Sequence, residues 1–210
     1  RVCHSAGTIY VHQLSGIFLD LMNLNKYYSK LVNDAVAAEG PIAVKKHQYK
    51  VMRELKGAIL DLLTTFFEVC REGHDTSALQ NPDLRPAVIL QTFMPKLMGE
   101  ILTDYKNSPS CARDSKVLSL FAQSISTFQS HLAVEVPRIM DAVFESTLEV
   151  ITSNMLDHPE HRTRFFKFLQ AANEHCFMGL FSIPQAQQKM VVDSIVWAVK
   201  HTDRNISETG

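Results

Sequence analysis

The sequence is poor in cysteine and has no motif that pairs the cysteines it does contain. Its four cysteines stand far apart, and none belongs to a Cys-x-x-Cys pair, so a disulfide framework is not expected. Cys70 and Cys176 follow apolar residues at helical spacing, which predicts that both are small core residues in a reducing compartment. Cys3, at the start of the chain, and Cys111, in an "SPSC" turn, are predicted to be the accessible ones.

An excess of one charge and long apolar runs are also missing. The chain has 21 Lys and Arg against 22 Asp and Glu, so no overall basic field favours nucleic acid. No apolar run approaches the ~18–20 residues that a membrane-spanning helix needs, and no signal peptide opens the chain. The chain begins without methionine and stops at "ISETG", where a new helix could start. We therefore expect a globular piece of a larger protein that binds neither nucleic acid nor membrane.

Catalytic fingerprints are absent as well. No G-x-S-x-G, Walker, H-E-x-x-H or glycine-rich nucleotide motif occurs. His158, His161, His175 and Cys176 are residue types that bind metals, but the first two flank a predicted helix start and the last two lie most of a helix away. A zinc site needs ligands that converge at about 2.0–2.3 Å from the ion, and this spacing does not provide them. The prediction is a protein that is not an enzyme and that has no catalytic residue, metal or cofactor.

The sequence does have the helical period of apolar residues in nearly every segment. No stretch alternates as an exposed strand does, so the predicted fold is all-α. Helices are predicted over about 10–35, over 46–72, over 86–105 with a kink or break at Pro95, from 115 to 130, and from Pro137 onward. The apolar stripe of the first helix is Tyr10, Leu14, Ile17, Phe18, Leu21, Tyr28, Leu31, Val32 and Ala35, and that of the second is Met52, Leu55, Ile59, Leu62, Phe66 and Cys70.

An internal repeat organises these helices. The segment "MPKLMGEILT" (94–103) returns 42 positions later as "VPRIMDAVFE" (136–145), and a weaker copy, "KMVVDSIVWA" (189–198), lies 52 positions further on. Units of this length are close to the ~40–47 residues of HEAT-type helical hairpins, which stack because one hairpin cannot bury its apolar face alone.

The repeat predicts a HEAT-repeat superhelical solenoid of about four helical hairpins. Their approximate limits are 7–73, 76–131, 134–181 and 184–210, the last one truncated. A single compact bundle of seven helices is the alternative arrangement of the same elements.

Three bases recur at helical spacing on one side of the second predicted helix. Lys46, Lys50 and Arg53 stand on the face away from its apolar stripe. One interpretation is an ordinary solvated face, and the other is a basic strip that binds an acidic partner. A second set of bases, between 162 and 167, forms a less regular stripe.

Three long strings carry a resemblance to a known family: "DAVFESTLEVI" (141–151), "PEHRTRFFKFLQAANEHCF" (159–177) and "DSIVWAVKHTDRNISETG" (193–210). They closely resemble the C-terminal half of the exportins, which are nuclear export receptors of the importin-β (karyopherin) superfamily. A weaker likeness at "GIFLDLMNLNKYYS" (16–29) extends the resemblance over most of the chain.

The resemblance implies a ring-like stack of HEAT repeats without enzymatic activity. It implies transport of cargo proteins with leucine-rich export signals in complex with GTP-bound Ran, contact with nucleoporins, and shuttling between nucleus and cytoplasm. It also places the family's drug-reactive cysteine outside this part of the chain. The alternative function is a HEAT-repeat scaffold subunit that assembles a cytosolic enzyme complex.

Overall fold

The computed structural model describes residues 9–76, 86–153 and 158–200. Within these ranges the chain is helical with short connections and has no β-strand, so the all-α prediction is confirmed. None of the described helices is both long enough and apolar enough to cross a lipid bilayer. In chain order the elements are α2 (Ile9–Glu39), η1 (Pro41–Lys45), α3 (His47–Thr76), α4 (Pro86–Leu97), η3 (Met98–Leu102), α5 (Thr103–Asn107), η4 (Ser110–Ala112), α6 (Lys116–Phe128), η5 (Gln129–Glu135), α7 (Val136–Ser153), α8 (Pro159–His175), α9 (Phe177–Leu180) and α10 (Gln185–Val199).

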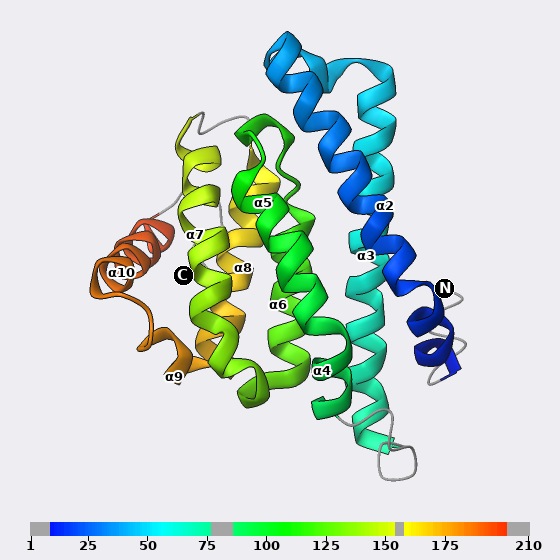
Figure 1. Cartoon of the computed structure of the whole chain (residues 1–210). Helices are drawn as coiled ribbons and strands as arrows, with labels where there is room; N and C mark the ends of the chain where they lie inside the picture. The colour runs from blue at the N-terminus through cyan, green and yellow to red at the C-terminus, as the bar shows by residue number, and fades with distance from the viewer. Residues whose placement is uncertain (1–8, 77–85, 154–157, 201–210) are drawn as a thin grey trace.

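The helices stack side by side in chain order, from α2 on one side of the molecule to α10 on the other (Figure 1). One layer contains α2, the helix formed by α4, η3 and α5, and then α7. The second layer contains α3, α6 and α8, in which α6 packs against both neighbours. Contacts of α2 with α3 and of α7 with α8 join the layers. The fold is an all-α HEAT-repeat solenoid, whereas the four predicted hairpin limits stay a prediction.

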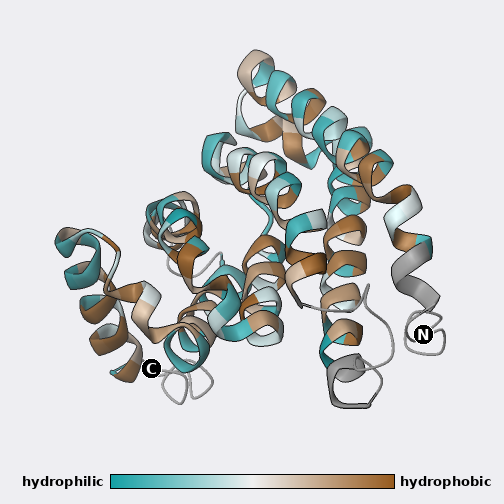
Figure 2. Ribbon diagram, turned by 60° about the horizontal axis from the view of Figure 1, so that its bottom comes forward, coloured by the Kyte–Doolittle hydropathy of each residue, from teal (hydrophilic) through white to brown (hydrophobic). Residues whose placement is uncertain are grey.

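Hydrophobic and hydrophilic segments alternate along every helix (Figure 2). On α2, the buried line runs through Leu14, Phe18 and Met22 at steps of four residues. Ile17 is 48% exposed, so its place in the predicted stripe is wrong. Each helical residue advances by about 100°, and Ile17 therefore lies beside the contact line rather than on it. The side chain of Tyr10 lies outside the described residues.

A buried lysine explains the second departure from the predicted stripes. Leu55 on α3 is 43% exposed, and its neighbour Lys56 is buried in its stead. The Lys56 ammonium donates to Asp104 Oδ2 of α5 at 2.9 Å, and Ser108 Oγ donates to the other oxygen of that carboxylate at 3.1 Å. A charge is tolerated out of water when it is paired and hydrogen-bonded in this way. The pair fastens the first layer to the second.

The sequence predicts a kink or break at Pro95, but the helix that begins at Pro86 continues through this residue without a break. Proline has no N–H to donate, and its ring crowds the preceding turn. The chain nevertheless stays helical through the wider π turn of η3 and into α5. A single π turn is one of the known local irregularities of α-helices. The first layer therefore keeps one long helix at this place.

The 42-residue repeat marks equivalent packing positions in adjacent helices. The aliphatic and aromatic residues that match between the two copies are all buried. They are Met94, Leu97, Met98, Ile101 and Leu102 on α4–η3, and Val136, Ile139, Met140, Val143 and Phe144 on α7. Tyr105 and Thr147, which are also 42 positions apart, touch through hydroxyl groups at a distance of 2.8 Å. Burial raises the pKa of Tyr105 to about 12. Equivalent residues of consecutive repeats thus meet in the core.

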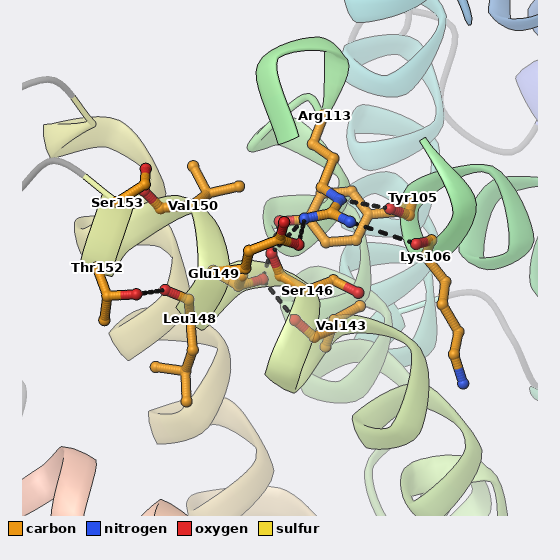
Figure 3. A network of polar contacts seen from close by, with 11 residues as sticks. Tyr105, Lys106, Arg113, Val143, Ser146, Leu148, Glu149, Val150, Thr152 and Ser153 are labelled. Atoms are coloured by element: carbon orange, nitrogen blue, oxygen red, sulfur yellow. Dashed lines mark hydrogen bonds and ion pairs between the residues drawn. The ribbon is translucent and has the colours of Figure 1, made fainter. Parts of the chain in front are cut away.

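Arg113 ties the turn after α5 to α7 (Figure 3). Its Nε donates to the Tyr105 carbonyl at 3.0 Å and its Nη2 to the Lys106 carbonyl at 3.4 Å. These two bonds supply hydrogen-bond donors to carbonyl groups in the last turn of α5. Its Nη1 donates to the Ser146 carbonyl of α7 at 2.9 Å and pairs with Glu149 at 2.5 Å. The Arg113 side chain is only 7% exposed, and its bonds to the Tyr105 and Ser146 carbonyls are buried.

The cysteine predictions that the described residues cover are confirmed. Cys70 and Cys176 are buried, whereas Cys111 is partly exposed. Burial raises the pKa of the Cys70 thiol to about 12 and also raises that of Cys176, which suppresses the reactive thiolate. Cys176 Sγ donates to the Gln129 carbonyl at 3.0 Å. Cys3 lies outside the described residues.

Candidate functional site

A polar cleft opens where the beginnings of α6 and α8 meet the first half of α3. Its volume is about 530 Å³. Its lining includes five Lys or Arg, three Asp or Glu and two His side chains. Pockets for small apolar ligands are lined mainly by hydrophobic residues, so a lining of this kind suits a charged partner instead. We call this site the polar cleft.

The structure brings two of the three predicted partner-binding bases into the polar cleft. Lys50 and Arg53 both line it. Lys46 does not, because its ammonium pairs with Glu39 of α2 at 2.7 Å, and the hydrogen bond to that carboxylate raises the pKa of Lys46. Lys50 has a long contact of 3.9 Å with Glu54.

Two further bases of the cleft come from other helices, and neither belongs to the basic strip predicted on the second helix. Lys116 at the start of α6 donates to Asp61 of α3 at 2.6 Å. It passes over Gly57, where an added Cβ would lie 3.1 Å from the ammonium. Arg164 of α8 donates to Ser115. Lys116 is a lone base at a helix start, so no spacing could reveal it, whereas the bases between 162 and 167 were a visible but irregular signal.

His158 and His161 stand on the cleft wall at the start of α8, with ring centroids 5.6 Å apart. Burial, and next the neighbouring His158, lower the pKa of His161 to about 4. The charges of Arg53 and Arg164 act in the same direction, whereas Asp114 acts against them. His161 is therefore neutral at physiological pH, and both arginines lie close enough to influence it.

The histidines and the cysteine considered as metal ligands are not brought together. His158 and His161 lie at the start of α8, and His175 and Cys176 lie at its end. Among the residues that the structure describes, no group of three or more His, Cys, Asp or Glu is arranged to hold a metal ion. His175 instead lies 3.9 Å from Glu174.

A second polar cavity lies beside the cleft and is lined mainly by residues of α6 and α8. Its volume is about 350 Å³, and it shares Arg164 with the polar cleft. Its lining adds Lys167 and a set of small or hydroxyl-bearing residues. We call the two adjacent cavities together the polar groove.

Stacked helical hairpins with a charged groove across one layer define a solenoid of the kind that binds other proteins. Comparison with known families shows to which family of such solenoids the chain belongs. The family model described as CRM1 C terminal matches residues 13–210. The chain belongs to this family.

Three relatives show how close the similarity is. Protein EXPORTIN 1B of Arabidopsis thaliana is 41% identical over 210 residues, which is 100% of this chain. Exportin-1 of Drosophila melanogaster is 37% identical over 210 residues, and Exportin-1 of Schizosaccharomyces pombe is 35% identical over 208 residues, each over 99% of this chain. The chain spans 18% of the length of each of these relatives. The resemblance to the exportins seen in the sequence is confirmed.

Proposed function

We propose that the chain is a structural and partner-binding segment of a nuclear export receptor. The receptor carries cargo proteins with leucine-rich export signals through the nuclear pore in complex with GTP-bound Ran. It contacts nucleoporins during passage and shuttles between nucleus and cytoplasm. The observation that carries this proposal is the family match over residues 13–210, with identities of 35% to 41% to proteins named exportin.

The segment contributes binding surface and shape rather than catalysis, and it needs no cofactor for either. Consecutive helices are fastened by the Lys56–Asp104 pair and by the Arg113 bonds, which supports a role in holding the superhelix to one curvature. We place the hairpins at the predicted limits. Of the predicted basic strip we keep Lys50 and Arg53 as partner contacts, because both line the polar cleft. The exportin relatives favour this function over a scaffold for a cytosolic enzyme.

The test uses the full-length protein that contains this segment. It is immobilised and incubated with GTP-loaded Ran and a fluorescent leucine-rich signal peptide, together and separately. We expect each ligand to increase retention of the other by about tenfold or more, since positive coupling between two sites is reciprocal. GDP-loaded Ran is the matched control. Peptide retention that is the same with GTP-loaded Ran, GDP-loaded Ran and no Ran would overturn the proposal.

A further inference from the structure

We propose that the polar groove binds an extended, acidic segment of a partner protein. The polar groove consists of the polar cleft and the second cavity, of about 530 and 350 Å³, which are adjacent because Arg164 lines both. Three helices that are far apart in the sequence build it: α3, α6 and α8. The inference extends the predicted basic strip to a site and does not depend on the assignment to nuclear export.

The charge of the groove favours an acidic ligand. Its combined lining has six Lys and Arg against four Asp and Glu, an excess of two positive charges. The whole chain has a net charge of −1, so the groove is more basic than the rest of the molecule. A cleft with one prevailing charge and low-dielectric walls attracts ligands of the opposite charge.

Two of these bases are available without breaking an internal ion pair. Arg53 and Lys167 form no ion pair with any residue that the structure describes. Arg164 lines both cavities, pairs with exposed Glu160 of its own helix at 3.2 Å and donates to Ser115. Arg53 and Arg164 both line the polar cleft, although they come from different helices. A partner with successive carboxylates can meet Arg53, Arg164 and Lys167 in turn.

The floor of the second cavity suits an extended main chain. Its lining includes Thr64, Ser119, Ala122, Ser126 and Ala171, all with short side chains. Short side chains let another backbone approach closely, and the hydroxyls can donate to its carbonyls or accept from its N–H groups. An extended segment needs such partners along its length, because it brings no internal hydrogen bonds of its own.

The same lining argues against two other ligands. Neither cavity is lined by Phe, Tyr or Trp, and single-stranded nucleic acid is held largely by stacking of bases on such rings. An amphipathic helix needs a hydrophobic groove for its apolar face, and neither cavity includes Leu, Ile, Val or Met in its lining. An acidic peptide in extended form needs neither feature.

The test measures binding of synthetic peptides to the 210-residue chain by fluorescence anisotropy at low salt. The probe is a labelled peptide of alternating Asp and Ser, and the control peptide has Asn in place of every Asp. We expect the acidic peptide to bind about tenfold more tightly than the control peptide, and salt at about 0.5 M to remove most of the difference. Arg53→Glu and Lys167→Glu should each weaken binding of the acidic peptide by about fivefold.

Lys30→Glu is the matched control variant, because Lys30 is an exposed base on α2 that lines neither cavity. It should change binding by less than about twofold. Circular dichroism of each variant checks that the helical fold is kept. Equal binding of the two peptides, or equal effects of Lys30→Glu and Arg53→Glu, would overturn the proposal. Tighter binding of a labelled oligonucleotide, with the same dependence on Arg53 and Lys167, would also overturn it in favour of nucleic acid.

Discussion

Replacing Arg113 should test how consecutive repeats are held together. Its guanidinium donates to the carbonyls of Tyr105, Lys106 and Ser146 and pairs with Glu149. Arg113→Ala removes all four contacts at once. The carbonyls in the last turn of α5 lie beyond the reach of the helix's own donors, so they lose partners that the rest of the helix cannot replace.

The loss in the free energy of unfolding depends on which carbonyl groups stay buried without a donor after Arg113→Ala. A buried carbonyl that loses its donor costs about 1–3 kcal/mol. The Tyr105 bond, at 3.0 Å, is of full strength, whereas the Lys106 bond, at 3.4 Å, is long and contributes less. Glu149 is 61% exposed, so its pairing contributes less than about 1 kcal/mol. We expect a loss of about 3 kcal/mol in the free energy of unfolding, or about 6–12 °C in Tm for a chain of this length.

Thermal and urea unfolding, followed by far-UV circular dichroism, measure this loss. Glu149→Gln is the control, since it leaves the carbonyl bonds in place, and it should cost less than about 1 kcal/mol. Arg113→Met keeps most of the apolar stem and removes only the donors. Buried ion pairs can be replaced by apolar residues without loss in some proteins. A Met variant as stable as the native chain would therefore refute the reasoning that the carbonyl bonds stabilise the repeat interface.

Three further predictions concern the core and its pH dependence. Phe144→Ala should lower the free energy of unfolding by about 3–5 kcal/mol because the ring is fully buried, whereas Glu145→Ala on the exposed side should cost less than about 0.5 kcal/mol; equal losses in urea unfolding would contradict this. Gly179→Ala should cost about 1–3 kcal/mol in a thermal melt, since the new Cβ would lie 2.7 Å from a carbonyl of η5; a gain, as at ordinary helical glycines, would show that α9 can shift. The pKa of His161 in the folded chain is lowered to about 4, so its contribution to stability is full above an unfolded pKa of about 6.5 and falls as pH drops from there toward 4. His161→Phe should therefore reduce the pH dependence of the free energy of unfolding, measured in urea, between about pH 7 and 4. An unchanged pH dependence would contradict this prediction.

The helices and the repeat could be predicted from the sequence because one physical cause produces both signals. Burial against a neighbouring helix requires an apolar residue every three or four positions, and a stack of similar hairpins requires the same stripe in each unit. Leu97 and Ile139, matched in sequence at 42 positions apart, are both 0% exposed. Predicted limits can differ by a few residues: the second helix runs through Gly73 to Thr76 rather than ending at 72. At Gly40, by contrast, φ is +77° and α2 ends where the Gly-Pro pair indicated.

The polar core and the polar groove could not be predicted in this way. Lys56 and Arg113 are buried through partners that stand dozens of positions away in the sequence, and no period within one helix announces a partner on another. The groove has the same origin. Spacing on α3 indicated Lys50 and Arg53, but only the packing of α6 and α8 against each other and against α3 shows which bases of those helices share their cleft.

The weakest copy of the repeat shows how far this dependence on neighbours extends. Val192 and Val196 of α10 are the counterparts, 52 positions on, of Met140 and Phe144. Met140 and Phe144 are both 0% exposed, and Phe144 packs on Phe165 of α8, yet Val192 and Val196 are 58% and 47% exposed. Residue type is apolar in both copies, so the difference lies in what surrounds them. On α7 the next helix of the hairpin covers the stripe (Figure 1). On α10 the buried residues are Val191 and Ala198, at 7% and 0% exposed, so a different face of this helix meets the core. Residue type within one copy of the repeat therefore does not determine which of its apolar residues a neighbouring helix covers.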